Sequence, residues 1–165
     1  MEIKLTLALP RDELSVPVAR RVLTQAMSVL GVEQEVTDDV QIALTEACTN
    51  VLDHANDADE YEVSAGIDDR ICVIEVIDRG EAFDGEVLGH EEADGAAEEG
   101  RGIQLMRALV DQVKFERRGD VGNVVRLEKT LRWHDDSVIK ALTEGKEPIQ
   151  HGPWSDDEHL EDAPQ

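Results

Sequence analysis

The sequence predicts a two-layer α+β sandwich, with helices on one face of a mixed, mostly antiparallel β-sheet. The first observation behind this prediction is the order of the periodic segments, which runs strand, two helices, hairpin, long loop, helix, hairpin. The second is their period. Apolar residues recur at every second position in the expected strands and at every third or fourth position in the expected helices. With 165 residues, the chain is long enough to bury a core as one domain.

The first half of the chain predicts one strand and two helices. Residues 3–9 alternate between apolar and polar side chains, which indicates a half-buried strand that Pro10 ends. Residues 16–30 carry apolar side chains at helical spacing. A second helix is expected to begin at Thr37, a capping residue followed by two acidic residues, and to run to about Ala55.

The second half predicts two hairpins with a helix between them. Their expected ranges are 61–67 with 71–77, then the helix 103–110, then 113–117 with 121–131. Residues 71–77 are almost continuously apolar, which is typical of a central strand. Residues 79–100 are rich in glycine and acidic side chains without a sustained period, and we interpret them as a mobile lid.

The composition divides the chain and restricts its partners. We expect one domain over residues 1–133. Residues 134–165 hold nine acidic residues against two lysines and predict an acidic, largely disordered tail with a short helix over 137–142. The formal net charge is −22, so direct binding of nucleic acid is not expected and basic protein surfaces are favoured as partners.

Neither the cysteines nor the apolar segments point to secretion or to a membrane. Cys48 and Cys72 both fall in apolar segments, and we predict that they are reduced core residues. The sequence shows no signal-peptide pattern and no apolar run approaching the ~20 residues of a membrane span. We therefore expect a cytoplasmic protein.

Three polar residues of the second predicted helix share one side of it. Glu46, Asn50 and His54 are spaced four residues apart, so they form a polar stripe. This stripe borders the apolar one formed by Val40, Leu44, Ala47 and Val51. A carboxylate, an amide and an imidazole in a row offer a base, a metal-binding oxygen and a hydrogen-bonding group. A solvated helix edge is the alternative interpretation.

Two later motifs favour the functional interpretation. The apolar strand 71–77 ends in Asp78-Arg79-Gly80, and Gly100-Arg101-Gly102 precedes the third predicted helix. In this order the three segments resemble the nucleotide site of the GHKL ATPases, which share the Bergerat, or histidine-kinase-like ATPase, fold. Within that group the chain looks most like the anti-sigma-factor serine kinases. The resemblance covers about residues 1–131.

The resemblance implies a role for each motif in binding ATP or ADP with Mg²⁺. Glu46 would be the catalytic base, Asn50 would bind Mg²⁺, and Asp78 would accept a hydrogen bond from adenine. The missing side chain of Gly80 would let the backbone approach the base, and N–H groups around Arg101 would hold phosphates. The implied nucleotide-binding set is Asn50, Asp53, His54, Asp78, Gly80, Ala82, Gly100, Arg101, Gly102, Ile103 and Asn123.

The resemblance also implies protein partners. Members of the family phosphorylate a serine of a small antagonist, a STAS-domain protein, and hold a sigma factor inactive in the nucleotide-bound state. Their first helix faces these partners, and Arg20 matches the place of an arginine there. A homodimer is expected from the resemblance.

Three departures from the family pattern leave a second function open. Ala82 stands where the family usually has a second glycine, and Asn123 stands where a threonine is common. Glu98 and Glu99 precede the Gly-x-Gly motif, where some members have a basic residue that Arg101 would have to replace. The alternative is a non-catalytic nucleotide-binding module that acts by sequestering a partner.

Two other classes of protein fit the sequence less well. A histidine-kinase core is disfavoured because no pair of dimerisation helices with a phospho-accepting histidine precedes the domain. A metal hydrolase that uses Glu46, Asp53 and His54 lacks a second histidine at ligand spacing.

Overall fold

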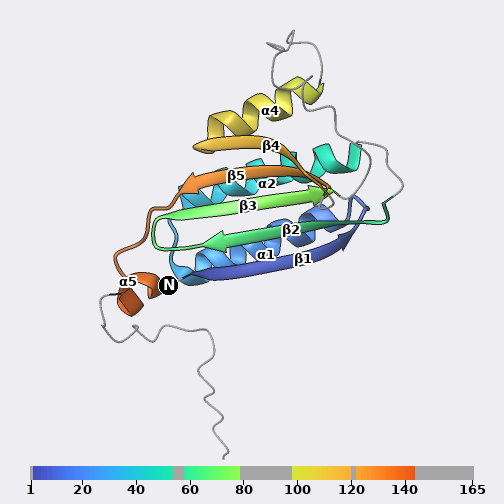
Figure 1. Ribbon diagram of the computed structural model, residues 1–165. Coiled ribbons are helices and arrows are strands. Elements are labelled where there is room, and N and C mark those ends of the chain that lie inside the picture. Colours follow the sequence, from blue (N-terminus) through green and yellow to red (C-terminus); the bar gives the residue numbers. More distant parts are fainter. Residues whose placement is uncertain (1, 54–57, 79–97, 120–121, 144–165) are drawn as a thin grey trace, which may run out of the picture.

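The computed structural model describes residues 2–53, 58–78, 98–119 and 122–143, which form two layers (Figure 1). The elements, in chain order, are β1 (Ile3–Pro10), α1 (Ser15–Leu30), α2 (Gln34–Asp53), β2 (Glu60–Ile67), β3 (Ile71–Asp78), α4 (Glu98–Leu109), β4 (Gln112–Arg118), β5 (Gly122–Thr130) and α5 (Val138–Thr143). The predicted α+β sandwich is therefore confirmed.

The five strands form one sheet in the order β1-β2-β3-β5-β4. The strand β3 lies at its centre, as its almost continuous apolar sequence predicts. Each pairing between the described strands is antiparallel, whereas we expected a mixed sheet with some parallel pairing. The antiparallel arrangement arises because two hairpins, β2–β3 and β4–β5, associate through their inner strands β3 and β5.

The core lies between the sheet and the helices α1, α2 and α4, which cover one of its faces (Figure 1). The period of two in β2 buries one side of the strand, from Tyr61 to Ile67, and leaves the other side partly exposed. Cys48 and Cys72 are free thiols within this core, as predicted. Burial raises the pKa of each thiol to about 12, so both are protonated at neutral pH.

The start of α2 differs from the prediction. The helix begins at Gln34, so Thr37 lies inside it and does not cap it. The Thr37 side chain is buried, and its hydroxyl donates to the Glu33 carbonyl at 3.3 Å. The core decides this boundary, because Val36 is buried at the same helical spacing as Val40 and its burial favours one further helical turn.

The fold continues past the predicted end of the domain at residue 133. The short helix α5 occupies Val138–Thr143, close to the short helix expected there, and its Ile139 is only 2% exposed within the core. Next to it, Gly31 ends α1 with a φ of +87°, and a Cβ at this position would lie 2.6 Å from the Ser137 Cβ. The boundary between domain and tail stays a prediction, since residues 144–165 lie outside the described part.

Among the described residues, no helix combines the length and the apolar character needed to cross a membrane.

Candidate functional site

Glu46 and Asn50 of α2 lie next to Gly102 of α4. A Cβ placed on Gly102 would lie 2.8 Å from Glu46 Oε2 and 3.6 Å from Asn50 Oδ1. Glu46 and Asn50 are both half-buried, so their side-chain oxygens lie against the backbone of α4 and not in open solvent. The structure therefore brings together two motifs that are more than fifty residues apart in the sequence.

The glycines of α4 lie further inside the helix than expected. The helix begins at Glu98, so Gly100 and Arg101 belong to its first four residues, whose N–H groups have no acceptor within the helix. Gly102 and Ile103 come after this turn, and the Ile103 side chain is buried. The N–H donors at this end of α4 are therefore centred on Gly100 and Arg101.

The third motif lies at the end of β3. Asp78 is 3% exposed, and Asn123 of β5 is its direct cross-strand partner, so both side chains point to the helix-covered face of the sheet. Arg11 Nη1 donates to Asp78 Oδ1 at 2.9 Å, and Arg11 Nη2 donates to the Val51 carbonyl of α2 at 2.6 Å. One guanidinium thus links the end of β3 to the last turn of α2.

The remaining predicted residues divide into two groups. Asp53 is exposed at the end of α2. His54, Gly80 and Ala82 lie outside the described residues, as do residues 79–97 of the lid that we expected over residues 79–100. For these positions the sequence-based roles stay predictions. Residues 98–100 of that expected loop belong instead to the first turn of α4.

Arg11 is the residue that sequence reasoning missed. It follows Pro10 directly, in a connection where an arginine reads as an ordinary solvated residue. The available signal was its rarity, since the chain has 16 basic residues against 38 acidic ones. Its side chain is only 11% exposed, which the composition does not reveal.

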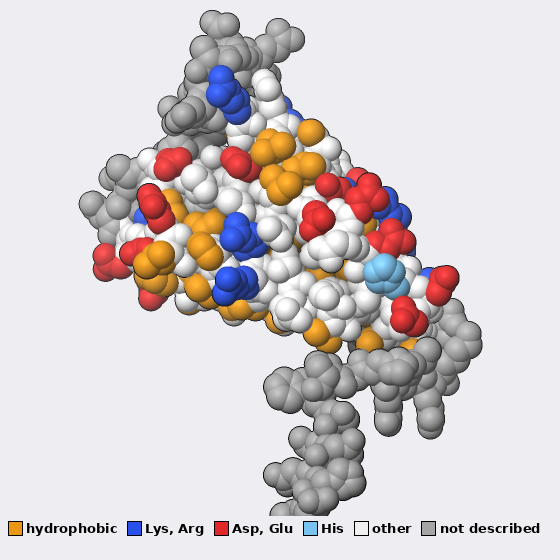
Figure 2. Space-filling model, turned by 180° about the vertical axis from the view of Figure 1, so that it is seen from behind, with side chains coloured by type: hydrophobic (Ala, Val, Ile, Leu, Met, Phe, Trp, Pro, Cys, Tyr) orange, Lys and Arg blue, Asp and Glu red, His pale blue; other side chains and the backbone are white. Residues whose placement is uncertain are grey.

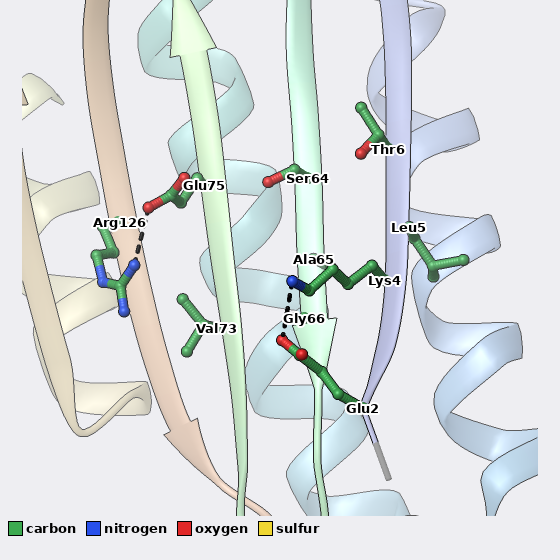
Figure 3. A pocket seen from close by; sticks show the side chains of 10 residues that line it. All are labelled: Glu2, Lys4, Leu5, Thr6, Ser64, Ala65, Gly66, Val73, Glu75 and Arg126. Atoms are coloured by element: carbon green, nitrogen blue, oxygen red, sulfur yellow. Dashed lines mark hydrogen bonds and ion pairs between the residues drawn. The ribbon is translucent and has the colours of Figure 1, made fainter. Parts of the chain in front are cut away.

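A hollow of ≈ 340 Å³ on the uncovered face of the sheet contains none of the predicted site residues (Figure 3). Charged side chains that line it are already paired: Lys4 lies 3.4 Å from Glu2, and Arg126 Nη1 donates to Glu75 Oε1 at 2.8 Å. Hydrogen bonds from Arg118, together with those from Arg126, hold the pKa of Glu75 below its usual value. This hollow is therefore an ion-paired sheet surface, separate from the residues around Gly102.

Arg20, the predicted partner contact, is half-buried on α1. Val18, Val22 and Val29 of the same helix are exposed apolar side chains, and so is Leu14 directly before it. The view from behind shows hydrophobic and basic side chains interspersed over the helical layer (Figure 2).

The donor set around Gly102 fits a hard cation and a phosphate. One carboxylate oxygen and one amide oxygen lie near the same point of the α4 backbone, and oxygen ligands of this kind suit Mg²⁺. N–H donors at the start of a helix attract anions. The buried carboxylate of Asp78 offers an acceptor for a polar group of a ligand at the end of β3.

Comparisons with known proteins show the family of this chain. A family model described as the histidine kinase-like ATPase domain matches residues 9–129. The serine-protein kinase RsbW of Bacillus velezensis is 34% identical over 125 residues, covering 68% of this chain and 78% of the relative. RsbW of Bacillus subtilis is 32% identical over 140 residues, covering 76% of this chain and 86% of the relative.

A solved structure has a similar fold. The RsbU and RsbW domains of a Mycobacterium tuberculosis protein match with a TM-score of 0.60 at 20% identity. The match covers 79% of this chain and 33% of that longer chain, so it bears on the fold alone. The family match spans α1, α2, β3 and α4, the elements that carry the candidate site. The chain therefore belongs to the histidine kinase-like ATPase family and, within it, to the type of the serine-protein kinases RsbW.

Proposed function

We propose that the protein is an ATP-dependent serine protein kinase that phosphorylates an anti-sigma-factor antagonist and, when it holds a nucleotide, sequesters a sigma factor. The substrate antagonist would be a small STAS-domain protein, and the kinase would act in the cytoplasm as a homodimer. The observation that supports the proposal is the approach of Gly102 to Glu46 and Asn50, because the proposed base and the proposed metal-binding oxygen would then lie next to the helix proposed to bind phosphate.

The proposed catalytic roles follow from the chemistry of phosphoryl transfer. ATP with Mg²⁺ supplies the transferable phosphoryl group and the charge neutralisation. Asn50 would supply one oxygen to the cation, and the N–H groups of Gly100 and Arg101 would hold phosphate oxygens. Glu46, one helical turn before Asn50, would orient the substrate serine and accept its hydroxyl proton.

The base-binding role falls to the end of β3. Asp78 would accept a hydrogen bond from the exocyclic amino group of adenine, and Asn123 on the neighbouring strand would assist with a polar side chain. Burial strengthens such a contact, since the surrounding core excludes competing water.

The first helix is the proposed surface for protein partners. The exposed apolar side chains of α1 give a partner area to bury, and the basic Arg20 and Arg21 suit an acidic counterpart. The support for this half of the proposal is a row of apolar residues on a helix whose opposite side packs into the core.

A second candidate function is a nucleotide-binding module without kinase activity. The sequence favours it at Glu98 and Glu99, because acidic residues directly before the Gly-x-Gly motif add negative charge where some family members have a basic residue. Such a protein would still sequester its partner.

Phosphorylation of the antagonist separates the two candidates. The purified full chain is incubated with labelled ATP, Mg²⁺ and a STAS-domain antagonist, and phosphoserine is measured by mass spectrometry. In Glu46→Gln we expect turnover to fall by about 10²- to 10⁴-fold, the usual contribution of a general base, with ADP binding retained. In Asp78→Asn we expect ADP binding itself to be lost.

Partner capture is measured on the same preparations. We expect Arg20→Ala to weaken sigma-factor binding, while Arg107→Ala, an exposed arginine on α4, leaves it unchanged. Wild-type protein that binds ADP and sigma factor but forms no phosphoserine would contradict the kinase assignment and favour the second candidate. Absence of nucleotide binding by calorimetry would contradict both.

A further inference from the structure

Arg11 makes contacts that join separate parts of the fold. Its guanidinium donates to Asp78 at the end of β3 and to the Val51 carbonyl in the last turn of α2. Its backbone N–H donates to the Asp59 carbonyl, just before β2, at 3.0 Å. The side chain is nearly buried at 11% exposed, and the Asp78 side chain is buried further at 5%.

The contact with Val51 has a local reason. The last carbonyl groups of a helix have no partner within it and carry partial negative charge. As described, α2 has no basic residue in its last turn. Arg11 therefore supplies from another segment the positive charge that this helix end lacks, and in doing so it fixes α2 relative to β3.

The contact with Asp78 has a chemical consequence. Carboxylate oxygens accept hydrogen bonds, and the Arg11 guanidinium fixes the position of the Asp78 carboxylate by donating to Oδ1. With two oxygens and about four lone-pair sites, it has the capacity to accept from more than one donor. A base with an amino group at position 6 donates to such an acceptor, whereas a base with an oxo group there presents a second acceptor and is repelled.

We propose that Arg11 is a specificity-determining and positioning residue: by holding Asp78 as a fixed acceptor, it makes the site select 6-amino purine nucleotides over 6-oxo purine nucleotides. This inference rests on the proposed function, because it takes Asp78 as the residue that meets the base. The same guanidinium fixes the position of the proposed base-binding end of β3 relative to α2, the helix that carries Glu46 and Asn50.

The test compares the binding of ADP and IDP, which differ in the group at position 6. Dissociation constants are measured by calorimetry with Mg²⁺ on the full chain as wild type, Arg11→Met and Arg11→Lys. A hydrogen bond to a charged group predicts that wild type prefers ADP by about 10- to 100-fold. In Arg11→Met we expect this ratio to fall to less than about threefold, because the guanidinium no longer fixes the Asp78 carboxyl, which can then rotate away from the base.

Arg11→Lys keeps the positive charge but loses the planar guanidinium that donates to two acceptors at once. We therefore expect its ratio of ADP to IDP affinity to lie between those of wild type and Arg11→Met. It also provides the measurement if Arg11→Met fails to fold. Arg132→Met is the matched control: it removes an arginine that pairs with Glu33 and Glu35 at the surface, and it should leave the ratio unchanged.

The possible results separate this inference from the proposed function. If both Arg11 variants keep the wild-type ratio of the ADP and IDP dissociation constants, the role in specificity is overturned. Arg11 would then have a structural role only, through its ion pair with Asp78. A wild-type protein that binds both nucleotides equally also overturns the role in specificity, while the proposed function stands. A wild-type protein that binds neither overturns both.

Discussion

Gly102 is where two elements of the candidate site touch, and the contact depends on the absence of a side chain. Its Cβ position is 2.8 Å from Glu46 Oε2, closer than a real Cβ approaches such an atom. The atom that would clash with a new side chain is at the end of the flexible Glu46 side chain. The helices α2 and α4 therefore need not separate when a side chain is added at Gly102. The carboxylate of Glu46 would move instead.

This geometry predicts that Gly102→Ala separates activity from stability. Alanine favours a helix over glycine by about 1 kcal/mol, which offsets the cost of moving Glu46. We therefore expect the free energy of unfolding to stay within about 1 kcal/mol of wild type. Serine phosphorylation should fall by about 100-fold, as is typical when a catalytic group is displaced by ~1 Å.

Gly66→Ala is the matched control for this substitution. Among the described residues, a Cβ there meets Glu2 Oε1 alone, at the ordinary contact distance of 3.7 Å, so turnover should not change. Full turnover in Gly102→Ala would show that the position of Glu46 does not depend on the missing side chain.

At the scale of elements, ion pairs connect neighbouring strands on the face of the sheet that α1, α2 and α4 do not cover. Glu75 of β3 accepts from Arg118 of β4 and from Arg126 of β5, so one carboxylate connects three neighbouring strands. The hydrogen bonds from Arg118 and Arg126 lower the pKa of Glu75 in the folded protein. A lowered pKa stabilises the fold above the unfolded value of about 4.3 and loses this effect as the pH falls through the folded value.

Glu75→Gln should therefore reduce the stability of the protein in a pH-dependent way. At pH 7 we expect a loss of roughly 1 kcal/mol in the free energy of unfolding, the upper end for partly exposed pairs. The difference from wild type should shrink below about pH 4, because protonation removes the same charge from the wild-type side chain. Urea denaturation between pH 3 and pH 7 measures this, with Glu2→Gln as an exposed control. A constant difference across the range would contradict the electrostatic explanation.

At the scale of the whole molecule, the last described helix, α5, packs against the core near the end of α1. The α5 residue Ile139 is buried in the core, and Ser137 lies against Gly31 at the end of α1. The acidic C-terminal part of the sequence thus begins with a segment that belongs to the fold. The sequence predicts this segment as part of the tail because the C-terminal part contains few apolar residues.

Ile139→Ala should destabilise the whole domain. Removing a buried isoleucine side chain costs about 2–5 kcal/mol through lost burial and the cavity left behind. Leu142→Ala changes a residue of the same helix that is 51% exposed, and it should stay within about 0.5 kcal/mol of wild type. Chemical denaturation followed by circular dichroism compares the two, and equal effects would show that α5 is not part of the cooperative unit.

The sequence by itself determined the order and type of the elements, the central position of β3 and the family. These properties depend on local periods and turn residues, which each segment carries within itself. Tertiary structure alone decided that α2 begins before Thr37, that Gly102 lies against Glu46, and that Arg11 reaches Asp78 across 67 positions of sequence. Contacts of this kind form only when distant segments meet in the folded chain, so no local pattern predicts which side chains they join.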